Sequence, residues 1–240
     1  MKAFIFAAGL GTRLYPYTKS APKALVPLQG IPMLGHLILK LKSFGIIDII
    51  INIHHFGEQI ISYLEENENF GCHIIISDER KELLDTGGGL KKALNMLEDG
   101  EDLLVHNVDI LSDFDLNILI DRHKKSKSKV TLLVQDRKTS RYLLFDEQNK
   151  LHGWTNIKTG ETKPTNIEVK NYRPFAFNGI HVINKSSLPY FNEENAFPII
   201  PIYIEMSQQE EIKAVEIDDS FWMDLGKPKA IDKANKWMSS

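Results

Sequence analysis

Cysteine is nearly absent from this sequence, since Cys72 is the only one in 240 residues. A single cysteine excludes an internal disulfide and a metal site built from several thiolates. Long apolar runs are absent too: the longest, at residues 46–53, contains Asp48 and is far too short to span a membrane. The first apolar residues run straight into Gly9, unlike a secretory signal. We therefore expect a cytoplasmic protein with no membrane partner.

An excess of one charge is also missing. The chain has 29 Lys and Arg against 32 Asp and Glu, a formal net charge of −3. Its basic residues cluster only at 124–129, whereas a nucleic-acid surface needs a concentrated cationic face. We expect no nucleic-acid partner. With 42% hydrophobic and 25% charged residues the composition is that of an ordinary globular protein with a substantial core. The oligomeric state is not indicated.

The hydrophobic pattern predicts an α/β fold. Apolar, β-branched runs at 3–7, 48–53 and 73–77 predict strands, and helical spacing at 32–44 and 56–64 predicts the helices between them. This alternation indicates right-handed crossovers and a Rossmann-like mixed, mainly parallel sheet flanked by helices. Further strands are expected at 102–106, 130–135, 175–182 and 212–217, and further helices at 88–97, 113–125, 185–190, 197–206 and 228–238. The polar residues 136–175 predict a small antiparallel insertion.

The segment after the first strand carries the first candidate site. Gly9 and Gly11 permit positive φ and a close approach of a ligand to backbone N–H groups, which suits a phosphate. Arg13 offers a planar, permanently charged fork, and Lys23 offers a point charge on a loop stiffened by prolines.

Three other interpretations of this loop need weighing. A dinucleotide-binding turn needs a third glycine where the chain has Tyr15, and Pro16 breaks the following helix. A P-loop needs a Gly-Lys-Ser/Thr sequence that is absent. The third interpretation is a plain glycine turn with surface cations.

Two further segments carry chemical groups. Residues 84–90, Leu-Asp-Thr-Gly-Gly-Gly-Leu, are expected to open a helix with Asp85 or Thr86 as the N-cap. The bare glycine backbone there suits contact with a flat nucleobase. A flexible helix entry is the alternative. Asp109 follows a strand, where a carboxylate can hold Mg²⁺, although a turn residue is the alternative.

Together these motifs resemble the signature of the sugar-1-phosphate nucleotidyltransferases. The matching segments are Gly9-Leu-Gly-Thr-Arg13, Pro22-Lys23, Gly30-Ile-Pro-Met33 and the late Phe221-Trp-Met-Asp224-Leu-Gly-Lys-Pro228. The resemblance covers most of the chain and is loose between 136 and 175. Val108 departs from it, because the family usually has glycine before the aspartate.

The resemblance implies roles for individual residues. The nucleotide would contact Ala8, Gly9, Gly11, Thr12, Arg13, Lys23, Thr86, Gly87 and Gly88. Arg13 and Lys23 would be catalytic, and Asp109 and Asp224 would hold the Mg²⁺ cofactor. Asn178 and Gly179 would contact the sugar, with a glycine bulge as the alternative, and the antiparallel insertion would cover the sugar side. A Glu-Lys pair common in the family is not identifiable, because Glu168 and Lys170 lie outside a clear motif.

The implied function is transfer of a nucleotidyl group from a nucleoside triphosphate to a sugar 1-phosphate, with release of pyrophosphate. We expect one domain, 1–240, with a nucleotide-binding half at 1–135 and a sugar-binding half at 136–240. The chain looks most like the N-acetylmuramate-1-phosphate uridylyltransferases, which points to UTP, N-acetylmuramate 1-phosphate and a cell-wall role. Guanylyl, thymidylyl or cytidylyl transfer to another sugar 1-phosphate or phosphocholine remains open. A catalytically silent nucleotide-sugar sensor is the alternative of another class.

Overall fold

The computed structural model describes residues 1–217 and 219–239, which form two units interleaved along the chain. The first unit comprises Met1–Leu84, Val105–Phe114 and Ser220–Ser240, and the second comprises Asp85–Leu104 and Asp115–Asp219. These boundaries differ from a division at residue 135. The assignment of a nucleotide-binding half and a sugar-binding half therefore stays a prediction.

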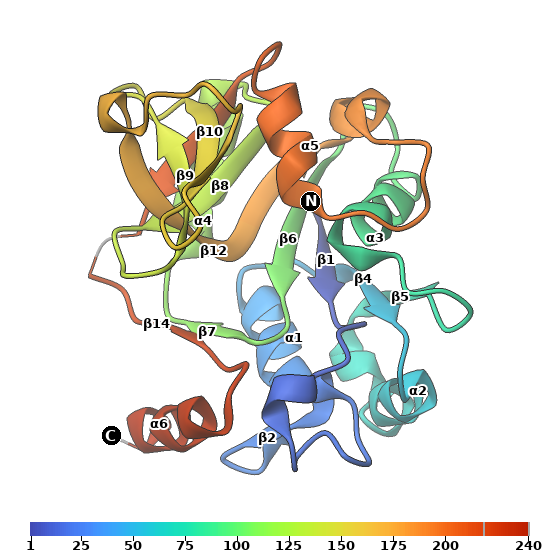
Figure 1. The fold of residues 1–240 in the computed structure, drawn as a ribbon. Coiled ribbons are helices and arrows are strands. Elements are labelled where there is room, and N and C mark those ends of the chain that lie inside the picture. The colour runs from blue at the N-terminus through green and yellow to red at the C-terminus, as the bar shows by residue number, and fades with distance from the viewer. Residues whose placement is uncertain (218, 240) are drawn as a thin grey trace. The chain divides into compact units, whose positions relative to one another are not determined.

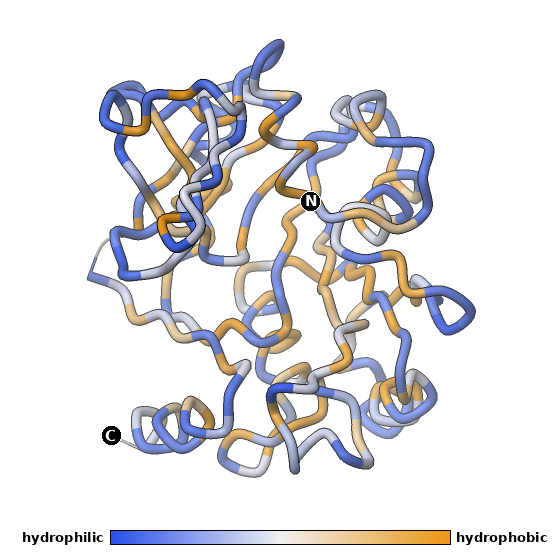
Figure 2. The backbone as a smooth tube through the Cα atoms, viewed as in Figure 1, coloured by the Kyte–Doolittle hydropathy of each residue, from blue (hydrophilic) through white to orange (hydrophobic). Residues whose placement is uncertain are grey.

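The first unit is built on parallel strands. β1 (Lys2–Phe6), β4 (Asp48–Ile53) and β5 (His73–Asp78) pair in that order, with Ala3 opposite Ile49 and Ile49 opposite Ile74. The last residues of β6 (Asp102–Asn107) lie on the other side of β1. Figure 1 shows these strands side by side, and Figure 2 shows how hydrophobic β1 and β4 are. Such continuous apolar strands are typical of a sheet covered on both faces.

Two helices connect these strands. α1 (Met33–Ser43) links β1 to β4, and α2 (Gly57–Glu66) links β4 to β5. Right-handed crossovers in one direction place both helices on the same face of the sheet. They pack closely, because the Tyr63 hydroxyl fills the space that a side chain at Gly35 would occupy.

The first unit also contains short elements that the hydrophobic pattern does not predict. β2 (Pro27–Leu28) and β3 (Ile31–Pro32) form a small hairpin, and β7 (Ile110–Ser112) pairs antiparallel with β14 (Trp222–Asp224). α6 (Pro228–Met238) follows β14 and has the predicted bounds. Strands of two or three residues are too short for alternation to identify, so only the fold reveals them.

The second unit combines parallel and antiparallel pairing. β8 (Val130–Gln135) pairs parallel with β13 (Ile212–Glu216) and antiparallel with β12 (Arg173–Asn184). β12 continues to β9 (Arg141–Phe145), β10 (Leu151–Asn156) and β11 (Glu161–Lys163), all antiparallel. This confirms an antiparallel insertion within residues 136–175.

The described residues of the second unit include three α-helices. α4 (Leu116–Ser126) packs on β8, β12 and β13, and α3 (Asp85–Leu94) packs on α5 (Ile199–Met206). The predicted starts of two helices are wrong by three residues. α3 begins at Asp85 rather than 88, so its glycines lie inside the helix, and α4 begins at Leu116 because Asp115 caps it by accepting from the Asn117 N–H.

The α/β class and the Rossmann-like sheet with its antiparallel insertion are thus confirmed. Among the residues that the structure describes, no helix has the length and apolar character needed to cross a bilayer.

Candidate active site

The end of β1 is held in place by a buried amide. Asn52 Oδ1 accepts hydrogen bonds from the backbone N–H groups of Ala7 (2.7 Å) and Ala8 (3.1 Å). Asn52 lies on β4, is 2% exposed, and donates through Nδ2 to Glu79 Oε1 at 2.8 Å. The glycine loop therefore starts from a fixed point, since a buried, satisfied network of this kind restricts the backbone.

Gly9 and Gly11 differ in what they require. Gly11 has φ of 64°, its carbonyl accepts from Thr18 Oγ1 at 2.9 Å, and a Cβ on it would lie 2.9 Å from the Lys23 Cβ. Gly9 does not have positive φ, and no atom lies within 4 Å of the place for its Cβ. Positive φ is thus confirmed for Gly11 and wrong for Gly9. Open space beside Gly9 leaves its backbone accessible to a ligand.

Lys23 and Asp109 form an ion pair in the first unit. The Lys23 ammonium donates to Asp109 Oδ2, and the side chains are only 16% and 10% exposed. Lys23 begins a 3-10 turn after the extended Pro22, which fixes the direction of its backbone. In such a shielded place the attraction is stronger than between surface charges, and removing either partner leaves the other poorly compensated.

Val108 shows that this chain does not need glycine before the aspartate. Val108 has no positive φ, and its N–H donates to the Phe6 carbonyl at 3.2 Å. Its side chain is 4% exposed and lines a small cavity that Leu225 also lines. The backbone before Asp109 is therefore ordinary, and the valine contributes packing.

The β7–β14 ribbon brings the late motif to Asp109. Asp224 pairs with Ile110, and the Leu225 N–H donates to the Asp109 carbonyl at 2.8 Å. Asp109 and Asp224 thus lie on neighbouring backbone positions despite their separation in sequence. Their carboxylates face different groups, since Asp109 binds Lys23 while Asp224 Oδ1 accepts from the Gly226 N–H at 2.7 Å.

Arg13 lies beside the turn that follows Asp224. A Cβ on Gly226 would lie 2.8 Å from Asp224 Oδ1 and 2.9 Å from Arg13 Nη2. A side chain at Gly226 would therefore displace the ends of the Asp224 and Arg13 side chains from their present positions. The first unit thus assembles Arg13, Lys23, Asp109 and Asp224. Of the other predicted residues in the glycine loop, Ala8 is buried and Thr12 is exposed in the 3-10 turn 12–14.

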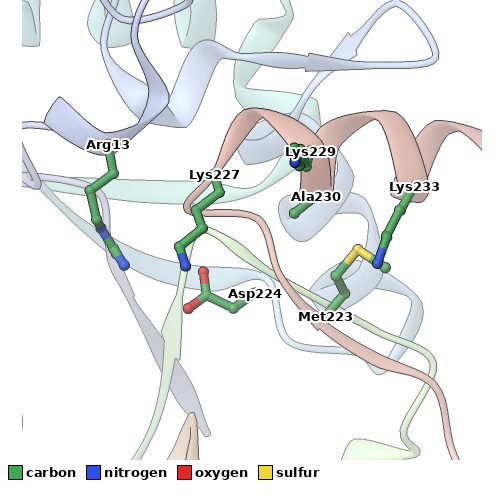
Figure 3. Close-up of a pocket in the computed structure, with 7 residues that line it drawn as sticks. All are labelled: Arg13, Met223, Asp224, Lys227, Lys229, Ala230 and Lys233. Atoms are coloured by element: carbon green, nitrogen blue, oxygen red, sulfur yellow. The ribbon is translucent and has the colours of Figure 1, made fainter. Parts of the chain in front are cut away.

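Arg13 and Asp224 also line a cavity of about 330 Å³, together with residues of α6 and its N-terminus (Figure 3). The remaining lining residues are Met223, Lys227, Lys229, Ala230 and Lys233. The lining carries four cations and one carboxylate. It can therefore hold an anion with several charges.

His106 lies three residues before Asp109 and is fully buried. Burial, and secondarily the ammonium of Lys40, lowers its pKa to about 3, against a weaker effect of its hydrogen bond to the Asn107 carbonyl. The imidazole is thus neutral at working pH and adds no charge to this region.

The glycine-rich segment belongs to the second unit. The Gly87 N–H donates to the Phe197 carbonyl at 2.7 Å, and the Phe197 ring fills the place of a Cβ on Gly87. Thr86 does not cap the helix as expected, because its hydroxyl accepts from the Ile199 N–H at 3.0 Å. Gly87 thus makes room for Phe197, which lies just before α5, and contacts of Thr86, Gly87 and Gly88 with a base stay a prediction.

Asn178 and Gly179 also belong to the second unit. Asn178 is fully buried and its Oδ1 accepts from Arg137 Nε at 3.4 Å, while Arg137 Nη2 donates to the Phe177 carbonyl at 3.0 Å. Gly179 has φ of 76° at a shift of register between β12 and β8. The glycine bulge is therefore present, and contacts with a sugar stay a prediction. Glu168 and Lys170 form an exposed surface pair at 3.5 Å.

Some residues of these sites escape sequence reasoning. Asn52 interrupts an otherwise apolar strand, Asp-Ile-Ile-Ile-Asn-Ile, and a buried polar residue is a signal that could identify it. The partners Glu79 and Arg137 have no such signal, because they follow strands in polar loops. Only the three-dimensional structure identifies them.

The chain is similar in sequence to known proteins. The model of the family described as "Nucleotidyl transferase" matches residues 2–240. The chain is 26% identical over 236 residues to N-acetylmuramate alpha-1-phosphate uridylyltransferase of Caulobacter vibrioides, covering 95% of the chain and 93% of that protein. It is 32% identical over 239 residues to mannose-1-phosphate guanylyltransferase catalytic subunit beta of Drosophila melanogaster, covering 95% of the chain and 60% of that protein.

A solved structure has the same fold. UDP-glucose pyrophosphorylase complexed with UDP-glucose superimposes with a TM-score of 0.79 at 14% identity, covering all of this chain and 98% of the other. At this identity the likeness concerns the fold. The family match over nearly the whole sequence, together with the assembled loop and aspartates, identifies the chain as a member of the nucleotidyl transferase family of enzymes.

Proposed function

We propose that this enzyme joins a nucleoside triphosphate to a sugar 1-phosphate, giving a nucleoside diphosphate sugar and pyrophosphate. The observation that carries the proposal is the meeting of Arg13, Lys23, Asp109 and Asp224 in one unit, through contacts among segments distant in sequence. A binding module would not need two cations and two carboxylates at one glycine loop. The sequence relatives named above act on sugar 1-phosphates, which supports the same substrate class here.

The reaction is an in-line attack. An oxygen of the sugar 1-phosphate attacks the α-phosphorus, the new P–O bond forms, and the bond to the β-phosphate oxygen breaks, so that the electron pair leaves with pyrophosphate. The attacking phosphate is already an anion, so no general base is needed. The barrier comes from repulsion between anions and from charge on the leaving group, which the protein lowers by positioning and neutralisation.

Each residue of the loop has a part in this scheme. The N–H groups near Gly9, with their open approach, bind phosphate oxygens, and Arg13 binds the β- and γ-phosphates through its fork. Lys23 neutralises charge at the reacting phosphorus. Asp109 holds the lysine in place until substrate arrives, because the two already pair within the protein.

Mg²⁺ fits the donors present. Asp109 and Asp224 supply carboxylate oxygens, the ligands a hard cation prefers, and Asp109 already holds a cation, the Lys23 ammonium. The described residues contain no group of three or more His, Cys, Asp or Glu that could hold a metal, so substrate phosphates would complete the shell. A bound Mg²⁺ would neutralise phosphate charge.

The metal assignment has a direct test. Mg²⁺ should bind the wild-type protein with nucleotide in calorimetry, and Asp224→Asn should weaken that binding about tenfold or more. Asp232→Asn, on the outer surface of α6, is the matched control. Equal Mg²⁺ affinity in wild type, Asp109→Asn and Asp224→Asn would overturn the assignment.

For the individual substrates we propose UTP and N-acetylmuramate 1-phosphate. The support is the match to the Caulobacter uridylyltransferase over 93% of its length, whereas the guanylyltransferase is matched over only 60%. This choice places the enzyme in the cytoplasm, in the supply of cell-wall precursors.

Pyrophosphate release from a panel of nucleoside triphosphates and sugar 1-phosphates tests both levels of the proposal. Release should need both substrates and be fastest with UTP and N-acetylmuramate 1-phosphate. Fastest release with another pair would overturn the substrate choice alone. Nucleotide binding without turnover of any pair would overturn the proposed reaction and favour a sensor.

A further inference from the structure

The cavity beside Arg13 is lined by cations that the proposed reaction has not used. Lys227 precedes α6, and Lys229 and Lys233 lie one turn apart on it. In Figure 3, Arg13 and Lys227 extend toward the carboxylate of Asp224, and Lys233 extends toward Met223. Three lysines and an arginine thus surround one cavity of about 330 Å³.

Among the described residues, these cations outnumber the carboxylates of the cavity by four to one. Within residues 1–217 and 219–239, Arg13, Lys227, Lys229 and Lys233 make no ion pair with a carboxylate. Asp224 is the only acidic residue in the described lining, and its Oδ1 accepts from Gly226. The cavity therefore has a surplus of positive charge, which favours an anion carrying more than one charge.

The placement of the lysines is unfavourable for the helix itself. Cations near a helix N-terminus oppose the macrodipole, and the first turn of α6 has no acidic residue. Lys229 and Lys233 are also four residues apart, where like charges repel. The position of these two lysines at the cavity is therefore not required by the helix.

We infer that Lys227, Lys229 and Lys233 extend the Arg13 phosphate site into a subsite for the terminal phosphates of the nucleotide and for the pyrophosphate product. This rests on the proposed function, in which Arg13 binds the β- and γ-phosphates. Arg13 lines the same cavity as these three lysines, so a phosphate bound by Arg13 would lie beside them. Inorganic pyrophosphate, with its dense charge, is the chemical species that matches four cations around one cavity.

The subsite has consequences for the direction of the reaction. Tight binding of pyrophosphate supports the reverse reaction, in which pyrophosphate attacks the α-phosphorus of the nucleotide sugar and the sugar 1-phosphate leaves. It also makes pyrophosphate a product inhibitor that competes with the nucleoside triphosphate.

The test is calorimetry with inorganic pyrophosphate in the presence of EDTA, which needs no knowledge of base or sugar. The double variant Lys229→Ala/Lys233→Ala should bind pyrophosphate about tenfold more weakly, as expected for two exposed charge-assisted contacts. Its Tm should be no lower than that of wild type at low salt, because alanine suits a helix and the repulsion is gone. A charge-matched control is Lys236→Ala/Lys125→Ala, which removes two exposed lysines outside the cavity.

Kinetics complete the test. In the double variant the KM for pyrophosphate in the reverse reaction should rise about tenfold, with the KM for the sugar 1-phosphate unchanged. Equal pyrophosphate affinity in wild type and double variant would overturn the inference, as would an equal loss in the control, which indicates general charge. A rise only in the KM for an acidic sugar 1-phosphate would also overturn it. If no substrate pair reacts at all, the proposed function fails, whatever the pyrophosphate titration gives.

Discussion

The Lys23 ammonium donates a hydrogen bond to the Asp109 carboxylate, although the two residues are 86 positions apart in sequence. The pair is largely shielded from water, with side chains 16% and 10% exposed. It joins the glycine loop to the end of β6, and the Leu225–Asp109 hydrogen bond joins the same point to the late motif. One aspartate thus connects the cations assigned to phosphate binding with the second carboxylate.

Replacing Lys23 tests its assigned role. Lys23→Ala should lower kcat by about 10²–10³, as loss of one oriented charge does in other enzymes. It should also destabilise the fold by about 1–3 kcal/mol, because the buried Asp109 loses its counter-charge. Steady-state kinetics and denaturant unfolding measure the two effects.

The two effects can be separated. In Lys23→Ala/Asp109→Asn the stability should return toward wild type while activity stays low, since no carboxylate remains unpaired. Lys19→Ala, an exposed lysine in the same loop, is the matched control and should be neutral in both. Normal turnover in Lys23→Ala would show that its charge does not act on the reaction.

Gly9 and Gly11 should respond differently to alanine. Gly11→Ala should destabilise the protein by about 1–2 kcal/mol, because the position has positive φ and little room beside Lys23 and Thr18. Gly9→Ala should leave Tm unchanged and weaken nucleotide binding, because the methyl group enters open space that the ligand is expected to use. Thermal unfolding and nucleotide titration distinguish them. Unchanged nucleotide affinity in Gly9→Ala would place the ligand elsewhere.

Asn52 should act as a positioning residue. Asn52→Ala removes the acceptor of the Ala7 and Ala8 N–H groups and should raise the KM for the nucleotide about tenfold while changing kcat less. Asn52→Asp keeps an acceptor but places a carboxylate beside Glu79, so its stability should improve as the pH is lowered and one carboxylate is protonated. A purely structural Asn52 would instead lower Tm in both variants without a change in KM.

The buried histidines predict loss of stability in mild acid. Burial lowers the pKa of His106 and of His181 to about 3, from an ordinary value of 6.5. The folded state favours the neutral rings. Their contribution to the free energy of unfolding is therefore complete above pH 6.5 and is lost as the pH falls toward 3. Each histidine should contribute a slope of about 1.4 kcal/mol per pH unit in this window.

Denaturant unfolding from about pH 6.5 to about pH 4.5 measures this slope. His106→Gln keeps a donor for the Asn107 carbonyl but does not titrate. The free energy of unfolding of this variant should therefore change less steeply with pH, by about 1.4 kcal/mol per pH unit. An identical slope in this variant would show that His106 is protonated in the folded state as readily as in the unfolded chain.

Much of the fold could be predicted because its strands and helices are long enough to show their periods. β1, β4, β5 and α6 follow from runs of apolar residues and from helical spacing. β7 and β14 could not be predicted, since three residues carry no period and the pairing joins distant segments. The starts of α3 and α4 depended on tertiary contacts and on a cap at Asp115, which override local propensity.

The candidate site divides in the same way. Arg13, Lys23, Asp109 and Asp224 were identifiable because each stands in a short motif with a chemical reason. The structure adds that they share one unit and that Gly226 makes room for Arg13. It also gives Gly87 a packing role against Phe197 that glycine content alone did not reveal. Asn52 is identifiable in principle, because it is a polar residue within an apolar strand.

Isotope transfer tests the central claim most directly. The sugar 1-phosphate is labelled with ¹⁸O in its phosphate and incubated with the nucleoside triphosphate, and the products are analysed by mass spectrometry and ³¹P NMR. Attack on the α-phosphorus predicts that all of the label passes into the nucleoside diphosphate sugar, with unlabelled pyrophosphate formed in equal amount. Label in the pyrophosphate, or hydrolysis of the nucleotide with the label left in unreacted sugar phosphate, would contradict the account.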